Sequence, residues 1–160
     1  MEKTLIFMKK ACIVADKSTC GYKTGCVIVK DSEELLRNKV LVEAWNESLL
    51  GESYCQDGVC YRQEQNLTGG KEIEKVCSIH AESSAVAICA SKGISIKEAS
   101  VYVTTFPCLI CARLLVKCEI GRLYYMSDYM GGNEGLALFG ANNIDVVKIE
   151  ESEVWNRKNG

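Results

Sequence analysis

The chain has no long hydrophobic run, no strong excess of charge of either sign, and only one proline and one histidine. No apolar stretch approaches the roughly 20 residues of a membrane-spanning helix, so no membrane association is predicted. The net charge of −2 and the sequence pI of about 5.6 argue against general electrostatic binding to nucleic acid. The first ten residues are interrupted by charged side chains, which is not typical of a secretory signal.

Cysteine, in contrast, is abundant, with ten in 160 residues. Because no secretory signal is predicted, we expect free thiols and metal ligands in a reducing cytoplasm rather than disulfides. Cys12, Cys89 and Cys118 are expected to be plain core residues, since a free cysteine packs like a small hydrophobic side chain.

The pattern of apolar residues predicts an α/β fold. A helix over 5–15 is followed by two β-branched runs, 25–29 and 40–45, which the charged stretch 30–38 joins as an antiparallel hairpin. Helices and strands then alternate, which favours crossover connections and parallel strands. The expected elements are a helix from His80 to Gly93, a strand over 100–105, a helix over 108–117, a strand over 123–126, a helix over 134–141 and a strand over 144–149.

These elements make a three-layer α-β-α arrangement with a mixed five-stranded sheet. We expect a single domain over 1–150, with an irregular, cysteine-containing insertion over 46–76 and a frayed C-terminal tail over 151–160.

The single histidine and the single proline both fall in one motif, H-x-E…P-C-x-x-C. It consists of His80-Ala81-Glu82 and Pro107-Cys108-Leu109-Ile110-Cys111. At the start of a helix the i, i+3 spacing puts both sulfurs on one face, and the helix N-terminus favours their thiolate forms. Together with His80 they offer three zinc ligands, which leaves a position open for water, as catalytic zinc requires. A redox pair, or half of a structural four-cysteine site, is the alternative for Cys-x-x-Cys alone.

Glu82 lies two residues after His80 and is not needed as a ligand. An unligated carboxylate beside an activated water is suited to general acid–base catalysis. The whole motif matches the signature of zinc-dependent nucleobase deaminases, in which this glutamate moves the protons.

From about Leu5 to Ile149 the sequence resembles the deoxycytidylate (dCMP) deaminase branch of the cytidine deaminase superfamily. The resemblance implies a cytidine-deaminase-like fold, hydrolytic deamination of dCMP to dUMP with release of ammonia, a Zn²⁺ cofactor and a homo-oligomer, often a hexamer. The stretches that carry it are 18–25, 45–48, 80–82, 102–112 and 125–129.

The resemblance also assigns roles to individual residues. His80, Cys108 and Cys111 match the zinc ligands, and Glu82 matches the proton shuttle. The candidate substrate-binding residues are Asn46 on the sugar and phosphate side, Ala81, Thr105 and Phe106 around the pyrimidine, Tyr129 as a substrate-facing ring, and Lys23 as a phosphate contact.

Four further cysteines, Cys20, Cys55, Cys60 and Cys77, are candidates for a second, structural zinc. Some relatives carry such a site in this region, and Cys20 and Cys55 match positions that contribute to it. A zinc ion bound by four thiolates would hold the long insertion in place, and Cys26 is an alternative ligand for this site. Metal analysis of the purified protein distinguishes the possibilities, because about two zinc ions per chain support the second site and about one removes it.

Other functions remain open at this stage. A deaminase of tRNA adenosine is disfavoured by the acidic pI, since binding a nucleic-acid backbone needs a positive surface. A zinc-binding relative without activity is disfavoured by Glu82, which a purely structural site does not need. Guanine and riboflavin-pathway deaminases share the motif, and only substrate assays exclude them.

Overall fold

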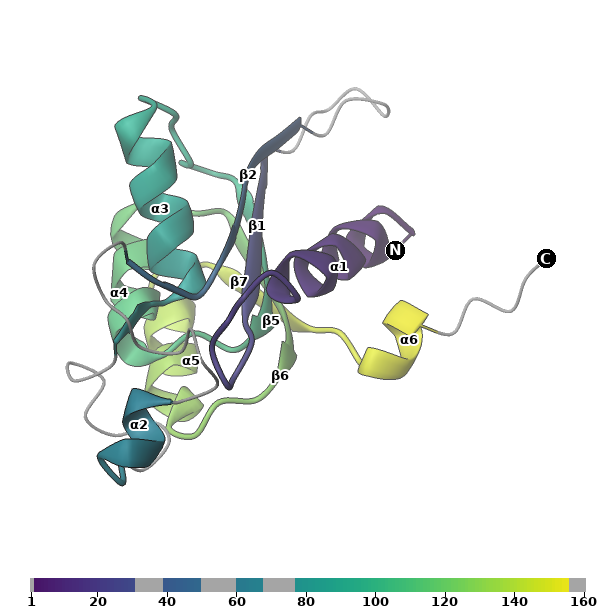
Figure 1. The fold of residues 1–160 in the computed structure, drawn as a ribbon. Helices are drawn as coiled ribbons and strands as arrows, with labels where there is room; N and C mark the ends of the chain where they lie inside the picture. Colours follow the sequence, from purple (N-terminus) through teal and green to yellow (C-terminus); the bar gives the residue numbers. More distant parts are fainter. Residues whose placement is uncertain (1, 31–38, 50–59, 68–76, 156–160) are drawn as a thin grey trace.

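The computed structural model describes residues 2–30, 39–49, 60–67 and 77–155 (Figure 1). In chain order the elements of these parts are α1 (Glu2–Ala15), β1 (Gly25–Lys30), β2 (Lys39–Trp45), β3 (Glu47–Ser48), α2 (Tyr61–Glu64), β4 (Ser78–Ile79), α3 (Ala81–Ser91), β5 (Ser100–Thr105), α4 (Leu109–Lys117), β6 (Arg122–Ser127), α5 (Gly132–Ala141), β7 (Asp145–Lys148) and α6 (Glu151–Trp155).

The main sheet has five strands in the order β2-β1-β5-β6-β7. The strand β1 pairs antiparallel with both β2 and β5, whereas β5–β6 and β6–β7 are parallel. The predicted mixed five-stranded sheet is therefore confirmed. The charged stretch over 30–38 was expected to join β1 and β2; Lys30 belongs to β1, and 31–38 lie outside the described residues.

Helices cover both faces of this sheet, which confirms the three-layer architecture. Figure 1 shows α3, α4 and α5 on one face and α1 and α6 on the other. The central strands are buried on both sides: Cys26 and Ile28 of β1 belong to the core under α3–α5, and Val27 and Val29 belong to the core under α1. A strand covered on both faces needs apolar residues at every position, which explains the unbroken run in β1.

Gly25, the first residue of β1, allows α1 to lie unusually close to the sheet. A Cβ atom at this position would stand 2.0 Å from the carbonyl oxygen of Ala11 and 2.8 Å from the backbone nitrogen of Ala15. Neither backbone atom can move away alone, so no other residue fits without shifting the helix. The loop 16–24 joins α1 to β1 directly before this contact.

The structure corrects two expectations about the irregular segments. The tail is not wholly frayed, because 151–155 form α6, whose Val154 is buried against α1 and whose Trp155 ring lies 5.3 Å from the Lys9 ammonium. The insertion also contains short regular elements, α2 and the strand β3, which pairs with β4 just before His80. Both elements are too short to show a hydrophobic period.

The three cysteines expected in the core are there. Cys89 is buried beneath α3, Cys118 packs against the same core, and Cys12 packs on the α1 side within 3.8 Å of the Met126 sulfur. No helix in the described ranges is both long and apolar enough to span a bilayer.

Candidate metal centre and active site

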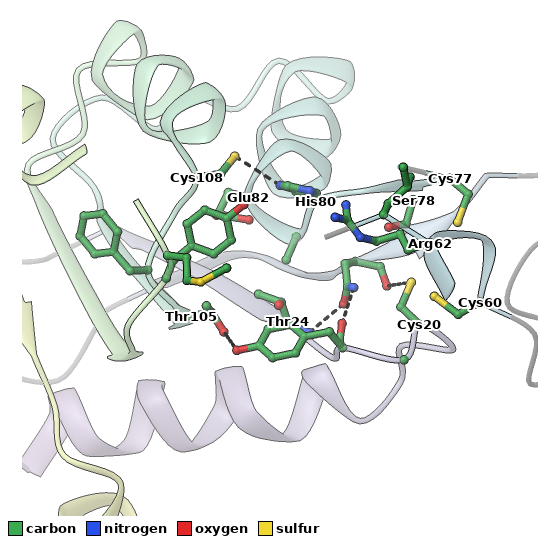
Figure 2. A pocket seen from close by; sticks show the side chains of 18 of the residues that line it. Cys20, Thr24, Cys60, Arg62, Cys77, Ser78, His80, Glu82, Thr105 and Cys108 are labelled. Carbon is green, nitrogen blue, oxygen red and sulfur yellow. Dashed lines mark hydrogen bonds between the residues drawn. The ribbon is translucent and has the colours of Figure 1, made fainter. Parts of the chain in front are cut away.

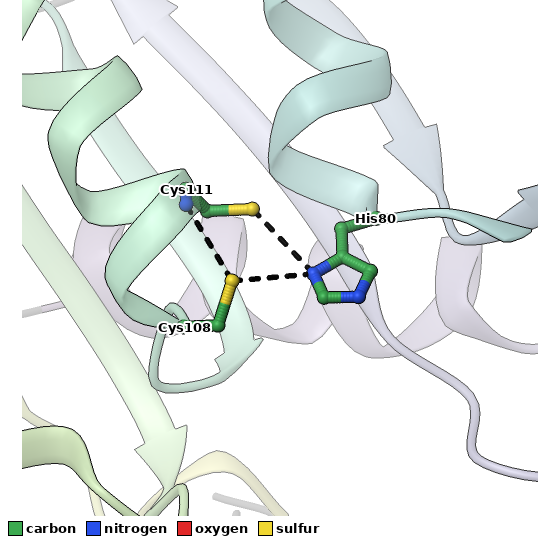
Figure 3. Close-up of side chains that lie close together, drawn as sticks. All are labelled: His80, Cys108 and Cys111. Carbon is green, nitrogen blue, oxygen red and sulfur yellow. Dashed lines mark hydrogen bonds between the residues drawn. The ribbon is translucent and has the colours of Figure 1, made fainter. Parts of the chain in front are cut away.

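Three side chains from the H-x-E…P-C-x-x-C motif converge at the N-termini of two helices. His80 is the residue before α3, Cys108 is the residue before α4, and Cys111 lies in the first turn of α4. The Nδ1 atom of His80 lies 3.5 Å from the sulfur of Cys108 and 3.5 Å from that of Cys111 (Figure 3). Among the described residues, this is the one group of three or more potential metal-binding side chains within 4.8 Å of each other.

These distances fit zinc. Zn–S bonds of about 2.3 Å and Zn–N bonds of about 2.0 Å, at a tetrahedral angle, place nitrogen and sulfur about 3.5 Å apart. Both Nδ1–Sγ separations in the site have this value. The donor set of one imidazole and two thiols is also what zinc prefers, and three ligands leave the fourth position for a reactant.

The local fold prepares the thiols for a metal. The backbone N–H of Cys111 donates to the Cys108 sulfur at 3.5 Å, and the Ser83 hydroxyl lies 3.4 Å from the Cys111 sulfur. Hydrogen bonding with Cys111 lowers the pKa of Cys108 to about 4, and the contact with His80 acts in the same direction. The shared proton raises the pKa of Cys111 in the absence of a metal. The pair therefore carries one thiolate before a cation arrives to stabilise the second.

Glu82 lies in the first turn of α3, directly beside this centre but outside the ligand group. Its side chain is buried, with 3% of the residue exposed. Burial raises the pKa of Glu82 to about 7, because the charged carboxylate loses its hydration. A carboxyl group with this pKa can both accept and donate a proton near neutral pH, which general acid–base catalysis requires.

The centre opens into a cavity of about 550 Å³, which is within the range of roughly 300–1,000 Å³ typical of small-molecule sites. The cavity lies at the carboxyl ends of the parallel strands β5 and β6, where α/β folds place their ligands. Figure 2 shows Glu82, His80 and Cys108 gathered at one side and Cys20, Cys60 and Cys77 at another.

Five of the six predicted substrate-binding residues line this cavity: Asn46, Ala81, Thr105, Phe106 and Tyr129. The sixth, Lys23, does not. Its ammonium donates a hydrogen bond to the Asp16 carbonyl at 3.1 Å on the exposed surface. The prediction of a phosphate contact at Lys23 has no support from its position.

Asn46 has a structural task that the motif did not indicate. Its side-chain oxygen accepts from the Thr24 N–H, and its amide nitrogen donates to the Tyr22 carbonyl, both at 2.7 Å. Asn46 therefore holds the 18–24 loop in place as one wall of the cavity. The strands β3 and β4 pair next to it, and this pairing brings Asn46 and His80 to the same end of the cavity.

The comparison with known proteins gives the family. The model described as the cytidine and deoxycytidylate deaminase zinc-binding region matches residues 1–127. This chain belongs to that family. The family binds zinc, and the candidate metal site of this chain is the group of His80, Cys108 and Cys111.

Two relatives and one solved structure are similar to this chain over most of its length. It is 27% identical over 149 residues to ComE operon protein 2 of Bacillus subtilis. The aligned part is 92% of this chain and 71% of the relative. It is 26% identical over 141 residues to the deoxycytidylate deaminase of Schizosaccharomyces pombe, and it spans only 42% of that enzyme. The structure of the dCMP deaminase from cyanophage S-TIM5 in complex with dCMP and dUMP superposes with a TM-score of 0.72 at 22% identity, over 92% of this chain and 97% of that one. This last likeness confirms the cytidine-deaminase-like fold.

The second cysteine set stays a prediction. Cys20, Cys60 and Cys77 line the same cavity, while Cys55 lies outside the described residues. The Cys20 sulfur lies 3.8 Å from the carbonyl oxygen of Asn46. The alternative member, Cys26, is fully buried inside β1 in the α3-side core.

Several lining residues were missed by the motif-based prediction. The Tyr22 hydroxyl lies 3.3 Å from the Thr105 hydroxyl, and Arg62, Asp128 and Met130 also face the cavity. Asp128 is part of the 125–129 stretch and could have been selected on that signal. Tyr22 and Arg62 lie in irregular segments, where no sequence period indicates which side chains face inward.

Burial of Glu82 makes the stability of the metal-free protein depend on pH. The pKa of this group rises from 4.5 to about 7 on folding, so its contribution is complete below pH 4.5 and is lost as the pH rises through 7. In metal-free protein, Glu82→Gln is expected to raise the free energy of unfolding over wild type by about 3 kcal/mol at pH 8 and about 1 kcal/mol at pH 5. Urea unfolding at both pH values measures the difference. An advantage of equal size at the two pH values would show that Glu82 has an ordinary pKa.

Proposed function

We propose that the protein catalyses the hydrolytic deamination of dCMP, in which dCMP and water give dUMP and ammonia. The observation that carries the proposal is Glu82, a buried, unligated carboxyl with a pKa of about 7 next to a tetrahedral donor group. A structural zinc site has no use for such a group, whereas a hydrolase does. The match to named deoxycytidylate deaminases supports the choice of dCMP.

Zinc, when bound by these three residues, supplies the Lewis acidity that makes water a nucleophile near neutral pH. The protein's own part in the proton transfers is carried by Glu82. It accepts a proton from the water that attacks C4 of the pyrimidine and delivers it to the ring nitrogen N3. It then accepts the second proton from the hydroxyl now attached to C4 and donates it to the amino group, so that the C–N bond breaks, ammonia leaves and the product carries a carbonyl.

The cavity walls position the base for this reaction. Phe106 packs edge-on against Tyr125 and Phe139, with ring centroids 4.9 and 6.1 Å away, so its backbone and that of Thr105 are held rigidly next to the zinc ligands. Tyr129 faces the cavity and offers a ring against which a pyrimidine can pack. Rigid placement of this kind keeps the reacting carbon close to the nucleophile.

Ammonia release tests the proposal. The zinc-loaded protein is offered dCMP, CMP, deoxycytidine, dCTP, guanine and a tRNA anticodon stem under the same conditions. We expect dCMP to give the highest kcat/KM. A higher kcat/KM with guanine, or with the tRNA stem, would reject the proposed substrate while leaving the zinc chemistry intact.

We further propose that the deaminase works in the cytoplasm as a homo-oligomer, with a hexamer as the state implied by the family resemblance. The nine cysteines in the described ranges form no disulfide, which suits a reducing compartment. Ile110 on α4 and Leu136 on α5 are about half exposed, and apolar side chains of this size on adjoining helices are suited to a subunit interface.

A further inference from the structure

A second, smaller pocket also reaches the metal-binding group. It has a volume of about 220 Å³, and it is lined by all three ligand residues together with Ser78, Ile79, Ser83 and Ile110. Among the described residues, His80 and Cys108 line the larger cavity as well, but Cys111 does not. Glu82, in contrast, lines only the larger cavity. The ligand group therefore forms part of the wall between two pockets, and only one of them contains the acid–base residue.

The smaller pocket is unsuited to a nucleotide but offers donors to a metal ion. Its volume is below the range of roughly 300–1,000 Å³ that is typical of small-molecule sites. The described residues that line it include no carboxylate, no lysine or arginine, and no aromatic ring apart from the imidazole of His80. The Ser83 hydroxyl lies 3.4 Å from the Cys111 sulfur, so an oxygen donor stands beside a thiol. Ile110, which is 53% exposed, brings the pocket to the surface.

A metal site needs an entry path to its donors as well as the donors themselves. The smaller pocket borders all three donors, whereas the larger cavity borders two of them among the described residues. A nucleotide that is bound for deamination occupies the larger cavity, because Glu82 lies there. The smaller pocket leaves a path to the ligands that does not cross the position of the substrate.

We propose that zinc enters and leaves its site through the smaller pocket, which is formed by β4, the first turn of α3 and the first turn of α4. Metal exchange and nucleotide exchange then use different openings. The inference depends on zinc as the ion of the three ligands, and it does not depend on dCMP as the substrate.

Narrowing the smaller pocket from two of its walls tests the inference. Ile79→Trp on β4 and Ile110→Trp on α4 are each expected to slow the transfer of zinc from the loaded protein to excess pyridylazoresorcinol, a chromogenic chelator, by about 10-fold. Uptake of zinc by the metal-free protein should slow by the same factor, because one route serves both directions. The dissociation constant for zinc, measured by competition with the chelator at equilibrium, should therefore stay at the wild-type value.

Two control variants introduce the same side chain at other exposed positions. Met130→Trp narrows the larger cavity, so it should raise KM for the substrate and leave zinc transfer unchanged. Leu136→Trp lies outside the described lining of both pockets, on the apolar surface that Leu136 shares with Ile110. It accounts for any effect of subunit assembly and should also leave zinc transfer unchanged.

Each of the other outcomes contradicts a route through the smaller pocket. A wild-type transfer rate in zinc-loaded Ile79→Trp or Ile110→Trp would overturn the inference, and so would slow transfer in Met130→Trp, because the ion would then pass through the substrate cavity. A changed dissociation constant would show that the new side chain disturbs the ligands, and slow transfer in Leu136→Trp would show that assembly controls the rate. None of the zinc measurements needs turnover, so a failure to deaminate dCMP would reject the proposed function alone.

Discussion

Replacing Glu82 by glutamine is expected to lower kcat for deamination by about 1,000-fold or more while the zinc content stays at the wild-type level. Glutamine has nearly the same shape as the neutral glutamic acid but cannot accept a proton from water. Both proton transfers to the base depend on the same group, so a single substitution stops the reaction at its first step and also removes the later acid. The group lies outside the ligand triplet, and zinc binding should not need it.

The measurement pairs steady-state ammonia release with metal analysis of the same preparation. Glu134→Gln is a matched control, because it makes the same chemical change at an exposed position of α5, and its activity should equal that of the wild type. Turnover retained in Glu82→Gln would contradict the assigned role. Loss of zinc together with activity would contradict the placement of Glu82 outside the coordination sphere.

The same substitution separates catalysis from stability. Glu82→Gln should make the metal-free protein more stable at pH 8, because it removes the cost of a buried charge, and yet make the zinc-loaded enzyme inactive. A residue whose removal stabilises the fold and abolishes turnover is retained for its chemistry. This opposition is the usual mark of an active site.

The parts of the site that the sequence revealed are those defined by local geometry. Cys108 and Cys111 are one helical turn apart, and His80 and Glu82 open another helix, so short spacing was enough to predict a common face. The sheet could be predicted for a similar reason: 25–29 of β1 and all of β5 are buried, and neither run contains a charged residue.

The parts that the sequence concealed depend on how irregular segments pack. Tyr22 contacts Thr105 across 83 positions of the chain, and the Asn46 amide bonds to the loop that contains Tyr22. Such contacts follow from loop conformations, which carry no hydrophobic period. Lys23 and Arg62 illustrate the consequence. Lys23 belongs to the 18–25 stretch that carries the resemblance but lies on the exposed surface, whereas Arg62 of the insertion lines the cavity.

Position 25 requires glycine for a reason that only the three-dimensional structure explains. The sequence places Gly25 at the start of a strand, where a glycine ordinarily weakens pairing. The helix α1 crosses so near that a Cβ would meet its backbone at 2.0 Å. Gly25 also follows the 16–24 loop, which contributes Tyr22 and Thr24 to the cavity, so the packing of α1 against β1 and the cavity wall meet at this residue.

Cys108→Ala is expected to lower the zinc content by one ion per chain and to reduce ammonia release to background. Only His80 and Cys111 remain as donors in that variant. The lost donor is the thiol that most readily becomes a thiolate, because the pKa of Cys108 is about 4 in the metal-free site. The fall should be one ion whether the wild type holds one zinc or two. If the wild type holds about two zinc ions and Cys108→Ala holds about one, the remaining ion would support a second site at the other cysteines.

Cys118→Ala is the matched control, because Cys118 ends the same helix α4 but packs against the core away from the ligands. It should keep both the zinc content and the activity of the wild type. If Cys108→Ala kept its full complement of zinc and still turned over substrate, the metal would have to be held elsewhere. If the two variants lost zinc equally, damage to α4 rather than loss of a ligand would be the cause. The expected contrast follows from the geometry, because the His80 imidazole nitrogen lies 3.5 Å from each of the two sulfurs, and Cys118 is not a member of this ligand group.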